Sequence, residues 1–156
     1  MERISIYNIK YTTQIIKYPS KEFNKYRVKI MELFKLREPS KSLDFKILGK
    51  CKILLLKNEI SNMIYGFIIM HDFGRKYNLF MYHMIGNPKY KNVNVPLFFK
   101  FFDYASNQGY LNALAVLPME RKWIKYIFKR EGYKKTKFYK KNKKYSVYKK
   151  RIYHIV

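Results

Sequence analysis

The sequence predicts a single α/β domain, and three observations support this fold class. Its 156 residues are the length of one domain. Segments with the three- and four-residue spacing of amphipathic helices alternate with short runs of aromatic and branched side chains typical of strands. Turn-forming residues separate these segments, and the sequence contains neither an internal repeat nor a long linker. We therefore expect one domain over residues 1–156.

The N-terminal half is expected to hold a strand, a helix and three further strands. Residues 4–9 (ISIYNI) predict the opening strand. Ser20 is a candidate N-cap for a helix whose apolar side chains recur at helical spacing: Phe23, Tyr26, Ile30, Leu33 and Phe34. An antiparallel meander is expected over residues 52–56, 63–70 and 79–85. The tripeptide Asp72-Phe73-Gly74 between the last two strands is interpreted as a turn.

The C-terminal half predicts two helices, a central strand and a hairpin. One helix is expected to begin near Pro96, whose fixed φ suits the first helical position, and to end before Gly109. The nearly continuous apolar run 111–117 predicts a buried strand. A third helix follows and ends at Gly132. Segments 137–139 and 145–148 predict a hairpin around residues 140–144.

The net charge of +24 is the strongest compositional signal. Residues 1–78 hold sixteen Lys and Arg against seven acids, and residues 79–156 hold eighteen against three. Such basicity predicts binding to a polyanion, most commonly nucleic acid, or to an acidic protein surface. The alternative is a lysine-rich surface that reflects AT-rich codons and has no dedicated ligand. The same codon bias, visible in sixteen Tyr and twelve Phe, is typical of a virus, a phage or an AT-rich microbe.

Several other classes of site and location receive little support from the sequence. The lone Cys51 forms no disulfide within the chain, which favours an intracellular setting, and its apolar neighbours favour a buried thiol over a nucleophile. The sequence lacks metal-ligand spacing among its histidines, which are His71, His83 and His154, so no metal site is expected. No signal peptide or membrane-spanning run is evident, and a protein free in solution is expected.

Beyond residue 79 the sequence resembles the GCN5-related N-acetyltransferase (GNAT) family, with the best match over 79–151. The family's Pro-x-Tyr-Arg-Gly-x-Gly-x-Gly loop corresponds to residues 88–96 (PKYKNVNVP). Residues 108–110 (QGY) match the usual helix exit, and residues 130–133 (REGY) match the closing Gly-Phe ending. The resemblance implies a GNAT-like fold: a mixed, mostly antiparallel sheet of about six to seven strands flanked by helices.

The resemblance implies an acetyl-CoA site whose cofactor-binding residues are Lys91, Asn92, Val93, Asn94 and Val95. The family's loop holds the pyrophosphate with backbone N–H groups at a helix N-terminus. Here Asn92, Asn94 and Pro96 stand where the family has glycines. Asparagine tolerates left-handed geometry, so the loop's shape can persist, but the two side chains are expected to occupy space near the phosphates. Because Pro96 also lacks an N–H, we expect a weakened site.

The catalytic residues implied by the resemblance are incomplete. Many family members use a tyrosine of the last helix as the general acid, and Phe128 stands at that position. His83 is the one candidate catalytic base on the strand before the loop, because its pKa is ordinarily near neutrality. The alternative is a packed strand histidine with no chemical role.

These observations favour a GNAT-like protein impaired in catalysis that acts through its charged surface. The expected partner is nucleic acid or an acidic protein surface, in a viral or phage assembly, and the location is cytoplasmic or in a virion. The expected contact residues belong to the basic hairpin: Lys134, Lys135, Lys137, Lys140, Lys141, Lys143 and Lys144. Two alternatives stay open: an active acetyl-CoA-dependent N-acetyltransferase acting on a primary amine, and a structural subunit whose lysines merely protect a sheet edge.

Overall fold

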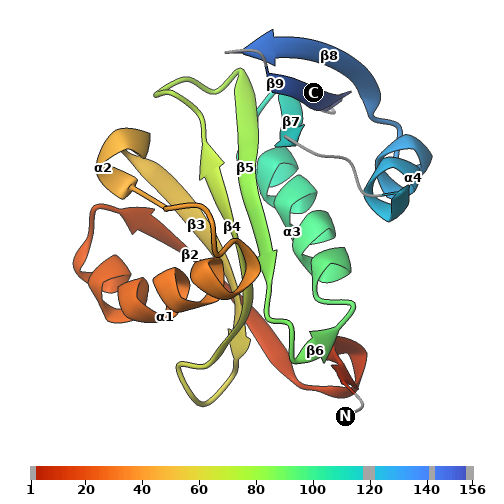
Figure 1. The fold of residues 1–156 in the computed structure, drawn as a ribbon. Helices are drawn as coiled ribbons and strands as arrows, with labels where there is room; N and C mark the ends of the chain where they lie inside the picture. The colour runs from red at the N-terminus through yellow and green to blue at the C-terminus, as the bar shows by residue number, and fades with distance from the viewer. Residues whose placement is uncertain (1–2, 118–121, 141–142, 154–156) are drawn as a thin grey trace. The chain divides into compact units, whose positions relative to one another are not determined.

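The computed structural model describes residues 3–117, 122–140 and 143–153. Seven strands form one sheet in the order β2-β3-β4-β5-β7-β9-β8, and β1 pairs with β6 separately (Figure 1). The strands are β1 (Ile4–Ser5), β2 (Tyr11–Tyr18), β3 (Cys51–Asn58), β4 (Ile64–His71), β5 (Asn78–Gly86), β6 (Tyr90–Lys91), β7 (Asn112–Leu117), β8 (Lys134–Lys140) and β9 (Lys143–Arg151). The helices are η1 (Ile6–Asn8), α1 (Lys21–Arg37), α2 (Phe45–Leu48), α3 (Asn94–Asn107) and α4 (Lys122–Arg130).

The chain separates into two compact units, which we call unit 1 (Met1–His71 with His83–Phe101) and unit 2 (Asp72–Tyr82 with Phe102–Val156). The predicted α/β class and the mixed sheet are confirmed. The expectation of one domain over the whole chain stays a prediction.

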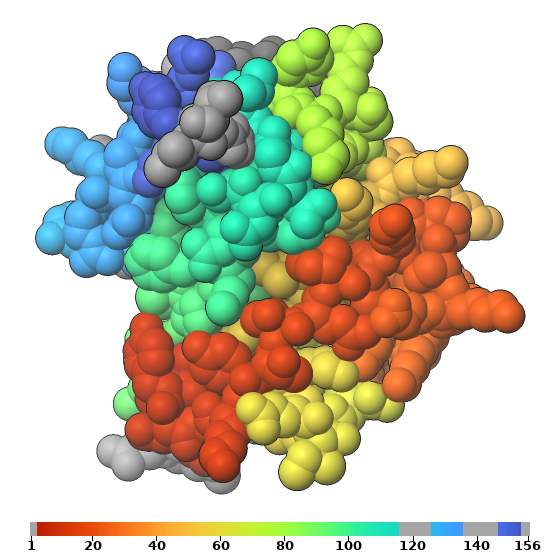
Figure 2. All heavy atoms as spheres, turned by 180° about the vertical axis from the view of Figure 1, so that it is seen from behind, coloured from red at the N-terminus to blue at the C-terminus, as the bar shows by residue number. Residues whose placement is uncertain are grey.

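Unit 1 is built on antiparallel strands with a helical layer packed on one face. β2 pairs with β3 from Tyr11↔Asn58 to Tyr18↔Cys51, and β3 pairs with β4. α1 begins as predicted, because the Ser20 hydroxyl accepts a hydrogen bond from the Phe23 N–H at 3.0 Å. Its predicted apolar side chains are buried against strand residues such as Ile53. Seen from the side opposite to Figure 1, residues 3–18 lie beside the β3–β4 hairpin (Figure 2).

The opening strand predicted over residues 4–9 is wrong beyond its first two residues. Ser5 accepts a hydrogen bond from the Tyr7 N–H, and the chain turns into the 3₁₀ helix η1. The sequence reading also missed β2. Its polar members include Thr12, Thr13 and Gln14, and as a half-exposed edge strand it lacks a continuous apolar run.

Unit 2 combines the first half of β5 with β7, β9 and β8. The parallel ladder between β5 and β7 runs from Asn78↔Asn112 to Met81↔Ala115. β9 pairs antiparallel with both β7 and β8, which confirms the predicted hairpin and extends its strands. The predicted turn at Asp72 is also confirmed, since its carboxylate accepts a hydrogen bond from the Gly74 N–H at 2.9 Å.

Cys51 is buried, and burial raises the pKa of its thiol to about 11, which supports its interpretation as an unreactive core residue. Among the described residues, no three His, Cys, Asp or Glu side chains gather as a metal site would require. Within the same residues, no helix combines the length and apolar character needed to cross a membrane.

Candidate functional site

The turn that joins β5 to α3 begins with a compact set of hydrogen bonds. The Asn87 N–H donates to the Tyr65 carbonyl at 2.8 Å, and the Tyr90 N–H donates to the Asn87 carbonyl at 3.1 Å. The Asn87 side chain accepts a hydrogen bond from the Lys89 N–H. The Tyr90 ring packs edge-on against Tyr65, with 4.9 Å between centroids. Residues 87–90 are thereby tied to β4.

The next residues of the turn are held by the N-terminus of the chain. β1 pairs with β6 in parallel, so that Ile4 lies opposite Tyr90 and Ser5 opposite Lys91. Asn92 has the left-handed geometry expected for it, with φ of 63°. Its side-chain amide donates to the Ser5 hydroxyl at 3.3 Å, and Lys91 is exposed beside it. An asparagine thus takes the backbone conformation for which glycine is the usual residue.

Close approach of the turn to β4 and β5 depends on two glycines. A Cβ at Gly66 would lie 2.7 Å from Val93 Cγ1 and 2.8 Å from the Ile85 carbonyl. A Cβ at Gly86 would lie 3.1 Å from Asn94 Oδ1. That oxygen is buried and has no hydrogen-bond partner among the described residues. The Val93 side chain is also buried, so only its backbone is available to a ligand.

The side chains of Asn92 and Asn94 contact other groups of the protein, and the expectation that they occupy space near a phosphate stays a prediction. The Asn92 amide is engaged by Ser5, and the Asn94 amide is packed against Gly86. Pro96 is not the first helical residue as predicted: α3 begins two residues earlier, at Asn94. Its first turn still includes Pro96, where an N–H lacks a partner within the helix.

The residues of the turn fit the pyrophosphate of coenzyme A. Within residues 3–117, the backbone N–H groups of Asn94 and Val95 have no hydrogen-bond acceptor. They lie at the positive end of the α3 dipole, where an anion is favoured, and Lys91 adds a positive charge. Pro96 removes one donor that a glycine would supply. The fit is present but reduced by one N–H.

His83 lies on β5 in unit 1 and packs edge-on against Phe34 of α1, with 5.2 Å between ring centroids. Burial is the main cause that lowers the pKa of its imidazole; Lys41 lowers it further, and Glu38 partly opposes this. The neutral form is therefore favoured at pH 7, which a general base requires and a packed histidine also permits.

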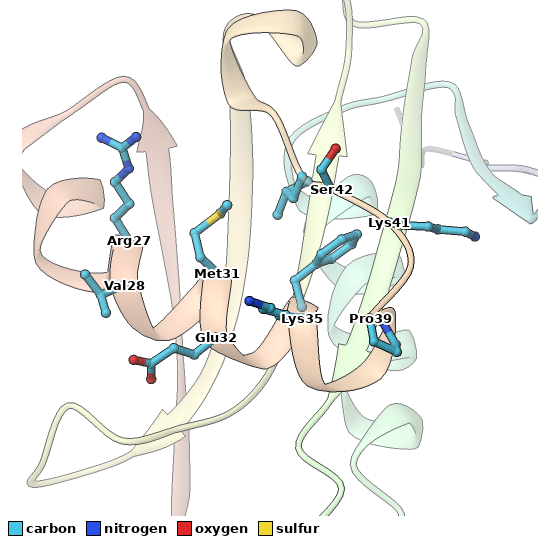
Figure 3. A pocket seen from close by; sticks show the side chains of 10 residues that line it. Arg27, Val28, Met31, Glu32, Lys35, Pro39, Lys41 and Ser42 are labelled. Atoms are coloured by element: carbon cyan, nitrogen blue, oxygen red, sulfur yellow. The ribbon is translucent and has the colours of Figure 1, made fainter.

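A hollow of about 480 Å³ lies in unit 1 between α1 and residues 39–43, and Phe34 is one of the residues that line it (Figure 3). Met31, Phe34 and Leu43 supply apolar walls, and Phe34 is the residue that His83 contacts. Figure 3 shows Arg27, Met31, Glu32 and Lys35 on α1, and the Lys41 side chain extending away from them. Because Glu32 also belongs to the lining, the hollow combines apolar walls with charges of both signs.

Phe128 is fixed within an aromatic cluster of unit 2. Its ring stacks on Tyr148 at 4.7 Å and meets Tyr133 edge-on at 4.9 Å. Only 1% of Phe128 is exposed. The residue that matches the family's proton-donating tyrosine is here a core side chain. Burial also raises the pKa of Tyr133.

The basic hairpin predicted as a polyanion site lies in β8 and β9. Lys134 is exposed, Lys135 is half-buried, and Lys137 and Lys140 continue along β8. Lys143 and Lys144 begin β9, and Lys141 lies outside the described residues. The register places Lys134 opposite Lys149 and Lys140 opposite Lys143. Like charges directly opposite one another on neighbouring strands are destabilising.

Sequence reasoning missed the residues that hold the turn from a distance. Ser5 contacts Asn92 across 87 positions of the chain. No local pattern reports such a contact. It also missed the role of Gly66, although an isolated glycine inside a strand run is a known signal of close backbone approach.

Comparison with solved structures shows that the chain has the GNAT fold. The crystal structure of a GNAT family acetyltransferase from Elizabethkingia anophelis with acetyl-CoA bound matches with a TM-score of 0.66 and 14% identity, over 91% of this chain and 98% of that one. The ribosomal-protein-S18-alanine N-acetyltransferase from Escherichia coli matches with a TM-score of 0.67 and 9% identity, over 93% and 97%. Ard1 from Thermoplasma volcanium matches with a TM-score of 0.65 and 9% identity, over 91% and 99%.

Searches by sequence found no matching family model and no matching curated protein. At these identities the structural likeness establishes the fold. It confirms the predicted fold class, while the activity is a separate question.

Proposed function

We propose that this GNAT-fold chain is impaired in acetyl transfer and acts through the basic surface of unit 2, which binds nucleic acid. Coenzyme A binding at the turn of unit 1 is weak in this account. An acidic protein surface, including one in a viral or phage assembly, is the competing partner and an outcome of the test below.

The observation that carries the proposal is the distribution of cations over β8 and β9. β8 is the edge of the sheet, where lysines protect against unwanted strand pairing. β9 lies between β7 and β8, and Lys149 is paired on both sides, with Leu114 of β7 and with Lys134 of β8. Edge protection does not account for a cation at this doubly paired position. The mutual repulsion of Lys134 and Lys149 across the ladder is relieved when a polyanion binds.

Impaired catalysis is supported by two features of the described residues. Phe128 has no proton to donate, and its burial in the aromatic cluster makes it a packing residue. Pro96 lowers the number of N–H donors at the start of α3. The phenylalanine removes a proton donor, and the proline removes an N–H donor to a phosphate. Together they favour a protein that has the acetyltransferase fold and a function other than acetyl transfer.

The test is binding of fluorescein-labelled DNA, measured by anisotropy from 25 to 300 mM salt. The proposal predicts binding at low salt and a steep linear fall of log affinity with log salt concentration. Absence of binding at 25 mM salt contradicts nucleic acid as the partner. Retention on an acidic protein resin, with no DNA binding, would favour the competing partner.

An active N-acetyltransferase is the second candidate, because the turn keeps its shape and His83 favours its neutral form. In this account the N–H groups of Asn94 and Val95 hold the pyrophosphate, and acetyl-CoA supplies an activated acetyl group when bound. His83, or a water beside it, accepts the proton of a primary amine. The hollow between α1 and residues 39–43 offers apolar walls to an acceptor.

Release of free thiol from acetyl-CoA, in the presence of a panel of primary amines, tests the second candidate. Turnover by the parent chain that is lost in His83→Gln would support it. Turnover of acetyl-CoA by the parent chain would also contradict the impaired catalysis of the first proposal.

A further inference from the structure

The sheet of unit 2 has two faces of different chemistry. Alternation along the strands and the ladder registers place Leu79 and Met81 on the same face as Ala113 and Ala115. Tyr148 lies opposite Ala115 and joins this face, where it stacks on Phe128 of α4. None of these five residues is more than 2% exposed. This is the core face.

The opposite face, which we call the outer face of unit 2, is aromatic at one side and basic at the other. Its residues alternate with those of the core face along the paired strands. They include Asn78, Phe80 and Tyr82 on β5, Asn112 and Leu114 on β7, Val147, Lys149 and Arg151 on β9, and Lys134 on β8.

An aromatic cluster adjoins this face at the turn before β5. Phe80 and Tyr82 are stacked, with 6.1 Å between centroids and 23° between planes. Phe73 meets Phe80 edge-on at 5.4 Å and is 58% exposed. Its φ of 55° lies in the left-handed region, which is unfavourable for a bulky side chain. The turn therefore holds a large ring at the surface at an energetic cost, a feature that often accompanies binding.

An amide pair lies beside the aromatic cluster. The Asn112 side-chain N–H donates to Asn78 Oδ1 at 2.9 Å across the β5–β7 ladder. This bond leaves Asn78 Nδ2 as a donor and Asn112 Oδ1 as an acceptor, since neither atom has another partner among the described residues. Both residues are half-exposed. An adjacent donor and acceptor match the hydrogen-bonding edge of an unpaired base.

The basic side of the outer face is formed by β8 and β9. Lys134 and Lys149 are exposed and lie opposite one another. Arg151, also exposed, has its guanidinium carbon 5.7 Å from the centroid of the Tyr153 ring. Tyr153 is 84% exposed and adds another ring. None of the residues that define the outer face is acidic.

From this arrangement we infer that the outer face of unit 2 binds single-stranded nucleic acid in preference to duplex. The inference deepens the proposed function and rests on it. Lys134, Lys149 and Arg151 neutralise phosphates, and the ring of Phe73 stacks on an unpaired base. In a duplex the bases are already stacked and paired, so the rings and the amide pair have nothing to engage. Charge attracts either form, and the aromatic side selects the single strand.

The experiment compares a 12-nucleotide oligo-dT with a 12-base-pair duplex by fluorescence anisotropy in 50 mM salt. Phe73→Asn removes the ring with a residue that tolerates positive φ, so the variant should stay folded, as a melting curve will verify. It is expected to weaken oligo-dT binding by about 5- to 100-fold and to leave duplex binding unchanged. Tyr7→Ala, which removes a ring of unit 1 with 60% exposure, is the matched control and should change neither.

The outcomes separate the inference from the proposed function. If the parent chain binds neither oligonucleotide, the proposed function fails and the inference fails with it. If the parent chain binds, and Phe73→Asn changes neither affinity or lowers both equally, the inference alone is overturned. The same holds if the duplex is bound more tightly than the single strand. Lys149→Gln should weaken both ligands together, which identifies the charge contribution.

Discussion

The turn of unit 1 and the outer face of unit 2 differ in whether backbone geometry or side-chain chemistry supports their proposed function. The turn keeps the backbone geometry that an anion needs while its residue types change: Asn92 is left-handed without being glycine. Unit 2 keeps a regular ladder and accumulates cations on it, with Lys134 opposite Lys149. In the proposed account the turn binds coenzyme A weakly, and unit 2 carries basic side chains that the fold itself does not require.

This difference teaches that backbone and side chains carry separate information about function. The likeness to acetyltransferases rests on the backbone, since identities to the solved structures are near 10%. The charge of unit 2 is carried by side chains, which the fold does not dictate. Experiments that perturb one region while leaving the other unchanged therefore test the account.

The largest effect is expected from Gly66→Ala in unit 1. The new Cβ would lie 2.8 Å from the Ile85 carbonyl, a backbone atom that cannot move aside, and 2.7 Å from Val93 Cγ1. Overpacking of this kind costs about 1–3 kcal/mol of unfolding free energy. Chemical denaturation measures the loss, and calorimetry should show that acetyl-CoA binding is lost too. Ile60→Ala, at a residue that is 97% exposed, is the control and should leave both unchanged.

Lys134→Gln is expected to move stability and binding in opposite directions. Removing one of two opposed lysines relieves repulsion and should raise the unfolding free energy by about 0.2–1 kcal/mol. Loss of a phosphate contact should lower the magnitude of the salt slope for single-stranded DNA by about 0.7. Lys21→Gln on α1 removes the same charge from an exposed site of unit 1. A loss of binding as large in Lys21→Gln would mean that net charge, and not this surface, is responsible.

Pro96→Ala should raise the affinity of the turn for coenzyme A. The substitution returns an N–H to the first turn of α3 without altering the charge. A further charge-assisted hydrogen bond to a phosphate contributes about 1.5–3 kcal/mol at best, so coenzyme A affinity should rise several-fold or more. Titration calorimetry measures the gain. Pro39→Ala, at an exposed proline of unit 1, is the control, and an equal gain there would contradict the role of the turn.

The smallest effect is expected at His83. Burial lowers the pKa of its imidazole in the folded chain, so the unfolded chain takes up the proton first as pH falls. Its contribution to stability is therefore complete above the unfolded pKa of about 6.5 and is lost as pH falls through the lower folded value. His83→Gln should flatten the decline in melting temperature between pH 7 and 5. An unchanged pH profile would show that the histidine is solvated.

The sequence predicted most elements of the fold and about half of the candidate site. Helix α1 follows from its apolar spacing and the Ser20 cap, and β3, β4 and β7 follow from their apolar runs. β2 was missed because an edge strand with polar side chains carries little apolar signal. The left-handed Asn92 was predicted from its residue type, but its anchor at Ser5 depends on a contact that only the folded chain creates.

The outer face of unit 2 was missed for a different reason. Residues 79–85 predict a strand from their aromatic and branched side chains and from the turn residues that bound them, and neither feature indicates which side chains face solvent. Which side of the strand faces the core is decided by the pairing of β5 with β7. The sequence therefore contained the aromatic residues and could not assign them to a face.

The most direct test of the account is titration calorimetry of the parent chain with acetyl-CoA, paired with a thiol-release assay on the same sample. A turn with one missing donor and a catalytic position held by Phe128 predicts a Kd of about 100 μM or weaker, with no thiol release above background. Binding at about 1 μM accompanied by turnover on a primary amine would contradict it.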